Sequence, residues 1–380
     1  MIFLKYELRK ALALPVLWAF LALCLALNLL LIFENNYGRE YFNDTSADAS
    51  LLGQRVDSAF IVGLSELPRT ENRDYLLASV ESFSDVFSDY DAAGLGAYYE
   101  SSFDRSPLAA SWIHQKYTLV AERIAELAAS GAGIELYAAD MTYPSHWFLF
   151  DTLLRAVTAE AVITGVLAAL YLTGCENVSH TVSLLCSSRA GRRQWFWKAL
   201  TGVLGALLLW LLLTGFSLAV YFVRWDYSGV WASNVSSGYN YVVDGIFVKP
   251  FITWSDFTVA GYLASSLGLS AALTAVCALL ASLVGILIRN MYAAALVMLL
   301  FGAGGLSAAV WLVNRMLGPA YIVSCFQPVI LWLDEAIWFT DSGLNTVLPW
   351  QEIIIIALWL TLGMAGTLLA YRRFAGKDIA

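Results

Sequence analysis

The chain alternates long apolar runs with shorter polar segments, and the length of the runs predicts helices that cross a membrane. An α-helix of about 20 apolar residues matches the roughly 30 Å thickness of the hydrocarbon layer. Six such runs lie at Ala11 to Phe33, Thr152 to Thr173, Ala199 to Val223, Thr258 to Ile288, Met291 to Val313 and Ile353 to Tyr371. The sequence therefore predicts an all-α integral membrane protein with six transmembrane helices.

Residues 34–146, between the first and second runs, have the pattern of amphipathic helices instead. Thr70 and Ser106 are typical N-caps, and Pro107 suits the first helical position after the second of them. Apolar side chains recur at helical spacing after each cap, at Leu76, Val80, Phe83 and Phe87 and at Ile113, Tyr117, Val120, Ile124 and Leu127. We expect a helical domain of about 110 residues in which the two apolar faces pack together.

The stretch from Asn314 to Trp350, between the fifth and sixth runs, is apolar and aromatic but repeatedly interrupted. Gly318-Pro319, Pro328 and Asp334-Glu335 divide it into pieces, each shorter than the roughly 20 residues that a span needs. Such pieces fit re-entrant or interfacial helices whose ends are covered by protein. We expect a hairpin embedded in the membrane that does not cross it.

Composition agrees with a membrane protein. The chain is 59% hydrophobic and only 14% charged, and its mean hydropathy is +0.66. A water-soluble domain of this length does not have such a composition. None of the five cysteines has a partner suited to an extracytoplasmic disulfide, so we interpret them as small apolar filler.

The net charge of −8 is unevenly distributed along the chain. Residues 34–146 hold 18 acidic and 7 basic side chains, whereas Met1 to Lys10, 174–198, Arg289-Asn290 and 372–380 are basic. Because short cytoplasmic segments are enriched in Lys and Arg, we expect both termini in the cytoplasm and a multi-pass protein of the cytoplasmic membrane. Met1 to Lys10 is expected to form an interfacial helix. The acidic outer surface either attracts cationic ligands or simply keeps that domain solvated.

The loop from Gly174 to Lys198 is the most informative polar segment. Val178, Val182 and Leu185 recur at helical spacing opposite a polar face, and a basic turn follows. The pattern predicts a short amphipathic helix from Asn177 to Ser187 on the cytoplasmic side. The residues alone leave two interpretations open, a helix that docks on a protein partner and a helix that lies on anionic lipid headgroups.

The order of residues in this loop resembles the coupling helix of ABC-2 type transporter permeases. Glu176 is followed by Thr181, a Leu-Leu pair, small residues, Arg189 and, at the start of the next span, Lys198. The phrase Lys-Tyr-Glu-Leu-Arg-Lys before the first span and the broken hairpin before the last are similar to that family as well. The resemblance implies coupling to an ATPase through Glu176, Val178, Thr181, Val182, Leu185, Arg189, Arg192 and Arg193.

The resemblance also implies a domain organisation and partners. Residues 1–33 would be the interfacial helix and first span, 34–146 the acidic domain, and 147–380 the permease core with its coupling helix at 174–198. Two ATPase subunits and a second permease subunit, identical or homologous, would complete an exporter of drugs, antimicrobial peptides, lipids or polysaccharides. The alternative is a membrane-anchored receptor or assembly protein that binds a partner through its acidic domain.

Two polar features lie inside predicted spans. Glu160 lies well inside the second span, where an ionisable group is costly enough to suggest either a substrate pathway or pairing with a neighbouring helix. Ser266, Ser270 and Thr274 are spaced by four residues in the fourth span and continue to Ala278 and Ser282. Such a row suits close helix packing, and a polar pathway lining is the other interpretation.

No catalytic or cofactor motif accompanies these features. The sequence has no phosphate-binding loop with a following Lys, and its three histidines lie in separate segments without the spacing of a metal site. The chain is therefore expected to be non-catalytic and to hold no cofactor, with ATP and Mg²⁺ bound by the partner ATPase. Nothing in it favours a nucleic-acid partner.

Overall fold

The computed structural model describes residues 2–103, 106–181, 194–244, 247–288, 290–314 and 318–375. Within these residues six helices are long and apolar enough to cross a membrane. Five of them are α2 (Pro15–Glu34), α11 (Gln194–Arg224), α12 (Val259–Leu287), α13 (Met291–Asn314) and α16 (Gln351–Ala375). The sixth is a continuous helical stretch from Ala139 to Val178. The prediction of a mostly helical protein with six helices of membrane-spanning length is confirmed.

The sixth stretch is longer than the predicted run at both ends. It consists of a 3₁₀ turn, η2 (Ala139–Met141), the short helix α8 (Thr142–His146), a π-helix, η3 (Trp147–Leu154), and α9 (Arg155–Val178). Its 40 residues correspond to roughly 60 Å of helix, about twice the thickness of the hydrocarbon layer. Part of it must therefore extend beyond the membrane.

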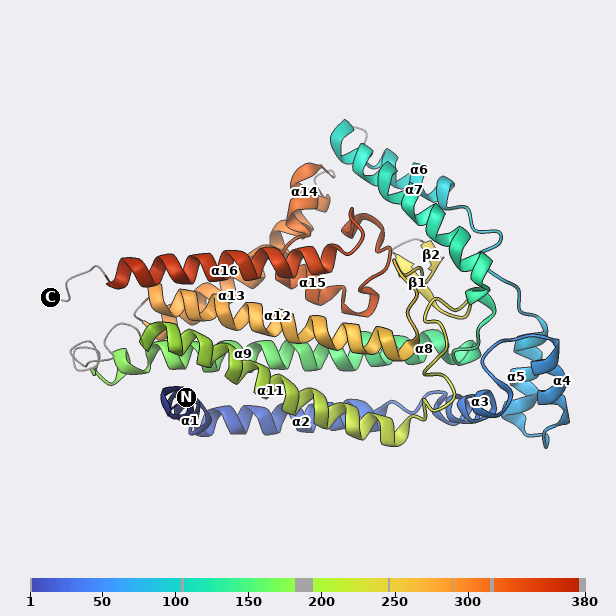
Figure 1. Ribbon diagram of the computed structural model, residues 1–380, viewed down its shortest axis with the longest axis horizontal. Coiled ribbons are helices and arrows are strands. Elements are labelled where there is room, and N and C mark those ends of the chain that lie inside the picture. Colours follow the sequence, from blue (N-terminus) through green and yellow to red (C-terminus); the bar gives the residue numbers. More distant parts are fainter. Residues whose placement is uncertain are drawn as a thin grey trace.

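The long helices run side by side in one bundle (Figure 1). α9, α11 and α12 pack against one another at its centre, α2 packs on α9 and α11, and α16 packs on α12. α13 lies at the edge and buries little of its surface. The end of the bundle that carries α1 and the C-terminal part of α16 is called the terminal end below, and the opposite end is called the loop-rich end.

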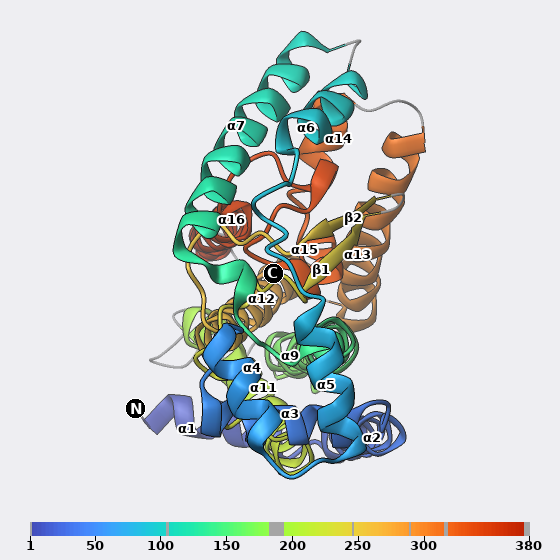
Figure 2. The same cartoon turned by 90° about the vertical axis from the view of Figure 1, so that its right-hand side faces the viewer.

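α1 (Ile2–Leu12) is a separate helix that lies across the terminal end instead of continuing into α2 (Figure 2). The chain turns at Pro15, the first residue of α2, and the indole Nε1 of Trp18 donates to the carbonyl of Leu12 at 2.6 Å across the corner. Proline suits this place because the first residues of a helix have no intrahelical acceptor for their N–H groups. A helix is thus present where one was predicted, and its place at a membrane surface stays a prediction.

The segment between α2 and η2 is helical, as predicted, and both predicted N-caps are present. It contains α3 (Arg39–Leu52), α4 (Ser58–Glu66), α5 (Glu71–Glu81), α6 (Ala92–Ser101), α7 (Pro107–Ser130) and the turn η1 (Ala132–Ile134). The hydroxyl of Thr70 accepts from the N–H of Arg73, and that of Ser106 accepts from the N–H of Ala109. Gly131, with φ of 70°, ends α7 in the left-handed conformation that glycine adopts readily.

The prediction that the two amphipathic faces pack together is wrong for Leu76 and Val80, and only Phe87 shares a core with the second stripe. α5 ends at Glu81, so Phe83 and Phe87 leave the stripe, and Phe83 stacks on Tyr239 with a ring separation of 4.0 Å. α3, α4 and α5 form one lobe whose core is continuous with the tips of α2 and α11. α6 and α7 form a second lobe with a different core. Figure 2 shows the two lobes side by side at the loop-rich end.

Neither lobe has a core of its own. Phe42 of the first lobe packs on Trp225 at the end of α11, and the α6–α7 lobe shares its core with Ile252, Tyr321 and Val347 from later parts of the chain. Residues 34–146 therefore share both of their hydrophobic cores with later parts of the chain and do not form the self-contained domain that the sequence suggested.

The connection between α11 and α12 holds a short β-hairpin. β1 (Tyr241–Asp244) and β2 (Phe247–Pro250) pair antiparallel, with Tyr241 opposite Pro250. The all-α expectation is wrong in this detail. The hairpin supports the α6–α7 lobe, because Phe247 contacts Tyr98 of α6 edge to face at 4.9 Å.

Four short elements fill the stretch between α13 and α16. They are α14 (Pro319–Ser324), α15 (Pro328–Leu333) and the 3₁₀ turns η5 (Glu335–Ile337) and η6 (Gly343–Asn345). None approaches the roughly 20 residues of a span. Side chains from neighbouring elements cover the carbonyls at the end of α15: Trp338 donates to Leu331 at 2.8 Å and Arg155 to Leu333 at 3.4 Å. Such cover is what backbone needs where water is absent.

One buried ionic cluster fixes the α6–α7 lobe to this stretch. The ammonium group of Lys116 on α7 lies 2.7 Å from Asp341 Oδ1, and that of Lys249 on β2 lies 3.0 Å from Asp341 Oδ2. The hydroxyl of Tyr117 also donates to Asp341 at 3.2 Å. All three charged side chains are almost completely buried. This cluster joins three segments that are far apart in the sequence.

Candidate functional site

The two helices that flank the basic loop extend further than expected. α9 continues through Asn177 to Val178, so these residues end a long helix and do not begin a new one. His180 then leaves the helical region with φ of 54°. On the other side α11 already begins at Gln194, which places Lys198 in its first turns. The predicted coupling helix therefore cannot begin at Asn177.

Most of the predicted coupling residues lie outside the described residues. This applies to Val182, Leu185, Arg189, Arg192 and Arg193, since the description stops at Thr181 and resumes at Gln194. Of the remaining three, Val178 is exposed at the end of α9, and Thr181 shares a hydrogen bond of 2.9 Å with the hydroxyl of Ser179. Glu176 is different because it is buried.

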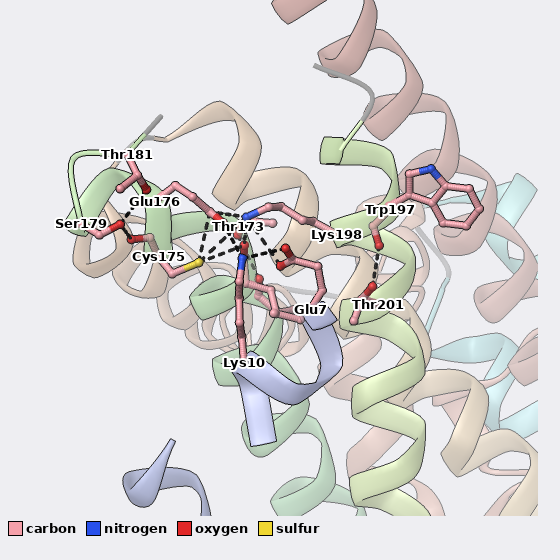
Figure 3. Close-up of polar contacts among 12 residues, drawn as sticks. Glu7, Lys10, Thr173, Cys175, Glu176, Ser179, Thr181, Trp197, Lys198 and Thr201 are labelled. Atoms are coloured by element: carbon pink, nitrogen blue, oxygen red, sulfur yellow. Dashed lines mark hydrogen bonds and ion pairs between the residues drawn. The ribbon is translucent and has the colours of Figure 1, made fainter. Parts of the chain in front are cut away.

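Glu176 belongs to a cluster of four charged side chains at the terminal end (Figure 3). Lys198 forms a close ion pair with Glu176 and donates to the carbonyl of Leu172 at 2.8 Å. Lys10 of α1 lies 2.7 Å from Glu7 and 3.2 Å from Glu176. Glu7 in turn lies 3.8 Å from Lys198. Two lysines and two glutamates therefore balance one another in one network.

Burial makes this network important for the structure. Lys198, Glu7 and Glu176 are almost inaccessible to solvent, whereas Lys10 stays partly exposed. A buried charge costs several kcal/mol unless a partner compensates it. Partial burial lowers the pKa of Lys10, but the carboxylates of Glu7 and Glu176 outweigh that effect and raise it above its usual value. The cluster, called the loop-anchor cluster below, holds α1, the end of α9 and the start of α11 together.

The sequence predicts a coupling role for Glu176 and places Lys198 at the start of a span, but it assigns no ion-pair partner to Glu7 or Lys10. One feature of the sequence did point to the Glu7–Lys10 pair. Glu7 is the only acid among the first ten residues, and it stands three residues before Lys10, which places the pair on one face of a helix. The partner across the bundle could not be found from spacing, because Lys10 and Glu176 are 166 residues apart.

Glu160 is buried among α2, α9 and α11 and has a specific partner. Its Oε2 accepts from Asn28 Nδ2 at 2.8 Å, and the same amide group lies 3.1 Å from the hydroxyl of Ser217. Asn28 is fully buried in α2. The structure thus places Glu160 in a three-helix polar contact, in agreement with the pairing interpretation.

Replacing Glu160 by glutamine is expected to leave the stability of the protein within about 1 kcal/mol, because the amide oxygen can still accept from Asn28. Glu160→Ala leaves that buried donor unpaired and is expected to cost about 1–3 kcal/mol. Thermal unfolding of the purified variants, followed by size-exclusion chromatography, measures the difference. If Glu160→Gln is as unstable as Glu160→Ala, the carboxyl group itself is required.

The row of Ser266, Ser270 and Thr274 is buried inside the bundle. The hydroxyl of Ser270 accepts from the indole of Trp210 at 2.9 Å and lies 2.7 Å from the hydroxyl of Thr158. Thr158 then donates to Glu335 at 2.7 Å. The indole N–H of Trp210 can only donate, so Ser270 must be the acceptor of that hydrogen bond. These contacts link α9, α11, α12 and the stretch between α13 and α16.

The row also permits close packing of helices. A Cβ added to Gly165 of α9 would lie 2.7 Å from the Cβ of Ala206 on α11 and 3.7 Å from Thr274 on α12. A Cβ on Gly202 of α11 would lie 3.1 Å from Ser282 of α12. Small residues on all three helices therefore allow their backbones to approach. Within the described part of the chain, the row therefore lies in contacts between helices.

An apolar groove lies elsewhere in the bundle. It has a volume of about 490 Å³ and is lined by α9, α12, α13 and α15. None of Glu160, Ser266, Ser270 and Thr274 is among its lining residues. The predicted pathway residues are therefore separate from this groove.

Comparison with known proteins adds no relative. No protein-family model, curated protein or solved structure matches the chain. Among the described residues, no group of three His, Cys, Asp or Glu side chains is placed to hold a metal ion. The arrangement of the described side chains is therefore the basis for a functional interpretation.

Proposed function

We propose that this chain is the transmembrane permease subunit of an ATP-driven exporter of the ABC-2 type. It would move a hydrophobic or amphipathic substrate across the cytoplasmic membrane, without catalytic activity of its own. Two copies of a separate ATPase and a second permease subunit, identical or homologous, would complete the transporter. The observation that carries the proposal is the loop-anchor cluster, which holds both ends of the basic loop.

The cluster supports the proposal because it could transmit a movement of the loop to the helices. A loop that receives force from a partner must be fixed to the helices that have to move. Here Glu176 and Lys198 flank the loop and pair with each other, and both contact α1 through Lys10 and Glu7. Because α9 and α11 are central helices of the bundle, a displacement of the loop would be transmitted to the core. A loop that only rests on lipid has no need for such an anchor.

The distribution of charge supports a cytoplasmic position for this end. α1 carries Lys5, Arg9 and Lys10, and Arg372 lies at the end of α16 at the same end of the bundle. The loop between Thr181 and Gln194 adds three arginines in the sequence. Short basic segments favour the cytoplasmic side. In this orientation both termini are cytoplasmic and the two lobes lie outside.

A second candidate function is a receptor or assembly protein that binds a partner through the lobes. It is favoured by their acidic surface, since residues 34–146 hold 18 acidic and 7 basic side chains. Such a protein needs no ATPase. The two candidates therefore differ in what must accompany the chain in the membrane.

The experiment is affinity purification of the full-length chain from membranes of the cells that produce it naturally. The exporter predicts a stoichiometric Walker-type ATPase whose hydrolysis responds to substrate. Val182→Asp is expected to release the ATPase or to abolish that response, because a charge replaces an apolar contact worth roughly 1.5–3 kcal/mol. Val223→Asp, at the exposed loop-rich end of α11, makes the same chemical change far from the loop and is expected to do neither. Absence of an ATPase, or a Val182→Asp protein with a normal response, contradicts the proposal.

A further inference from the structure

The apolar groove between α9, α12, α13 and α15 has features of a ligand site. It has a volume of about 490 Å³, within the range of small-molecule sites. Small residues create the space, including Ala159 of α9 and Ala295 and Gly302 of α13. Its lining side chains are apolar apart from the thiol of Cys277 and the indole N–H of Trp332, which already donates to the carbonyl of Arg155 at 2.9 Å.

The groove opens sideways from the bundle. Ile163 and Leu167 line it and are 47% and 44% exposed, respectively. An apolar space of this kind holds water poorly, because water would find no polar partner there. In a membrane it would be open to the hydrocarbon layer. Its natural occupant is therefore an apolar chain that enters from the side.

Arg155 lies beside the groove: it is not a lining residue itself, but its carbonyl accepts from Trp332, which is one. Arg155 is one helical turn before Ala159, on the face of α9 that continues to Val166 and Leu170 in the groove lining. Its Nη1 donates to Asp151 Oδ1 at 2.7 Å and to the carbonyl of Leu333 at 3.4 Å.

Arg155 also keeps capacity for a ligand. Its side chain is 32% exposed, and a guanidinium offers five N–H donors in a geometry that matches phosphate oxygens. Asp151, its acidic partner, is almost completely buried. The group that faces outward at the mouth of the groove is therefore the cation.

The depth of Arg155 fits a lipid headgroup. Arg155 and Glu176 are the two ends of a stretch of α9 that rises roughly 30 Å, the thickness of the hydrocarbon layer. If the loop-anchor cluster and α1, which lie at the terminal end, are taken as the level of one membrane surface, Arg155 falls at the level of the opposite one. The groove runs from Ala159 to Leu170, roughly 16 Å of helix, and so occupies about one leaflet below Arg155.

We propose that this groove binds one phospholipid of that leaflet, with an acyl chain between α9, α13 and α15 and the phosphate on Arg155. The acyl chain enters the groove from the side, out of the hydrocarbon layer, and does not have to displace water. The phosphate oxygens accept from the guanidinium N–H groups beside Leu333. This inference does not depend on an ATPase partner, and it stands or falls separately from the exporter.

The test uses the full-length protein in lipid nanodiscs that contain phosphatidylglycerol with a diazirine near the end of one acyl chain. After irradiation, labelled peptides are identified by mass spectrometry. Labelling is expected on the groove faces of α9 and α13, above the level on the exposed face of α16. Gly302→Phe is expected to lower it about tenfold, the effect of excluding about two methylene groups.

The control is Gly304→Phe. A Cβ at either Gly302 or Gly304 meets no atom within 4 Å, so the two positions are matched in the space at the start of the new side chain. Gly302 lines the groove, whereas Gly304 on the same helix is not among its lining residues. Labelling in Gly304→Phe is expected to match that of the unchanged protein. Equal labelling of the two variants, or labelling no stronger than on α16, overturns the groove assignment.

A competition arm tests the phosphate contact. Unlabelled dioleoyl phosphatidylglycerol is expected to compete better than dioleoylglycerol, which has the same chains and no phosphate. Arg155→Gln is expected to remove that preference while chain labelling persists. If the two lipids compete equally in the unchanged protein, or if Arg155→Gln retains the preference, the phosphate assignment is wrong.

Discussion

Replacing Asp341 by asparagine is expected to release the α6–α7 lobe and to lower the free energy of unfolding by about 3–5 kcal/mol. Asp341 is the shared carboxylate of two buried ammonium groups, those of Lys116 and Lys249. Its removal leaves two like charges buried close together without their common anion. The lobe is expected to detach first, because Lys116 is its ionic contact with the stretch between α13 and α16.

Hydrogen exchange measured by mass spectrometry on α7 tests this prediction. A loss of about 3 kcal/mol corresponds to exchange roughly a hundredfold faster. Asp256→Asn is the matched control: Asp256 also pairs with α7, through Arg123, but its side chain is 71% exposed. Arg123 is buried, but without the Asp256 charge it keeps Glu126 and the carbonyl of Thr253 as partners, so the expected loss is only about 0–1 kcal/mol. Similar exchange in the two variants would show that burial of Asp341 has no energetic consequence.

The same cluster sets a pH dependence for the unchanged protein. Burial alone would raise the pKa of Asp341, but Lys116 and Lys249 outweigh it and hold the pKa well below its usual value of 3.8. A depressed pKa of an acid contributes stability that is complete above the unfolded value and is lost as the pH falls through the folded value. Protection of α7 is therefore expected to be constant between about pH 5 and 8 and to fall only below about pH 4.

Replacing Lys198 by methionine is expected to have an effect of similar size at the other end of the bundle. The change leaves Glu176 and Glu7 buried with only Lys10 as a cation, and breaking one side of a buried pair costs about 3–5 kcal/mol. Glu176→Gln alone is expected to be comparably harmful. The double variant should recover much of the loss, since it removes both members of the closest pair together.

Thermal unfolding of the two single variants and the double variant measures this coupling. An interaction energy of about 2–3 kcal/mol between positions 176 and 198 is expected. Lys5→Met, on the exposed face of α1, is the control and is expected to change stability by no more than about 0.5 kcal/mol. Strictly additive single effects would mean that Glu176 and Lys198 act independently, and the loop-anchor cluster would lose its role.

Hydropathy was sufficient to predict the six long helices, because apolar length is the property that defines a membrane-spanning helix. It was a poor guide to their ends. α9 was expected to stop at Thr173, since Glu176 and Asn177 are polar, yet the helix continues to Val178. Pairing with Lys198 allows Glu176 to remain in a buried helix, and that partner is 22 residues away. Helix ends set by such contacts cannot be predicted from local polarity.

Amphipathic stripes predicted which side chains are buried but not what covers them. Leu76 and Val80 of α5 are buried as expected, and so are Ile113 and Tyr117 of α7. They belong to two different cores, each completed by residues from much later in the chain. An amphipathic stripe shows only that one face of a helix is buried, and it does not show which element covers that face. Lys116 illustrates the same limit, because a lysine between two stripe positions gave no sign that it would be buried against Asp341.

The π-helix Trp147–Leu154 affects the angle, about the helix axis, between α9 in the bundle and the turn η2 that contacts the first lobe. It lies in the middle of a helix that is continuous from Ala139 to Val178, and η2 at its beginning packs against α3 and α5. A π-helical turn is accommodated by extra residues in an α-helix, and each residue of an α-helix advances its direction by about 100°. One residue more or fewer in this segment would therefore turn η2 by about 100° relative to α9 and break its contacts with α3 and α5. Because the tips of α2 and α11 also hold this lobe, the length of the helical segment has to match a position that is fixed from two other sides.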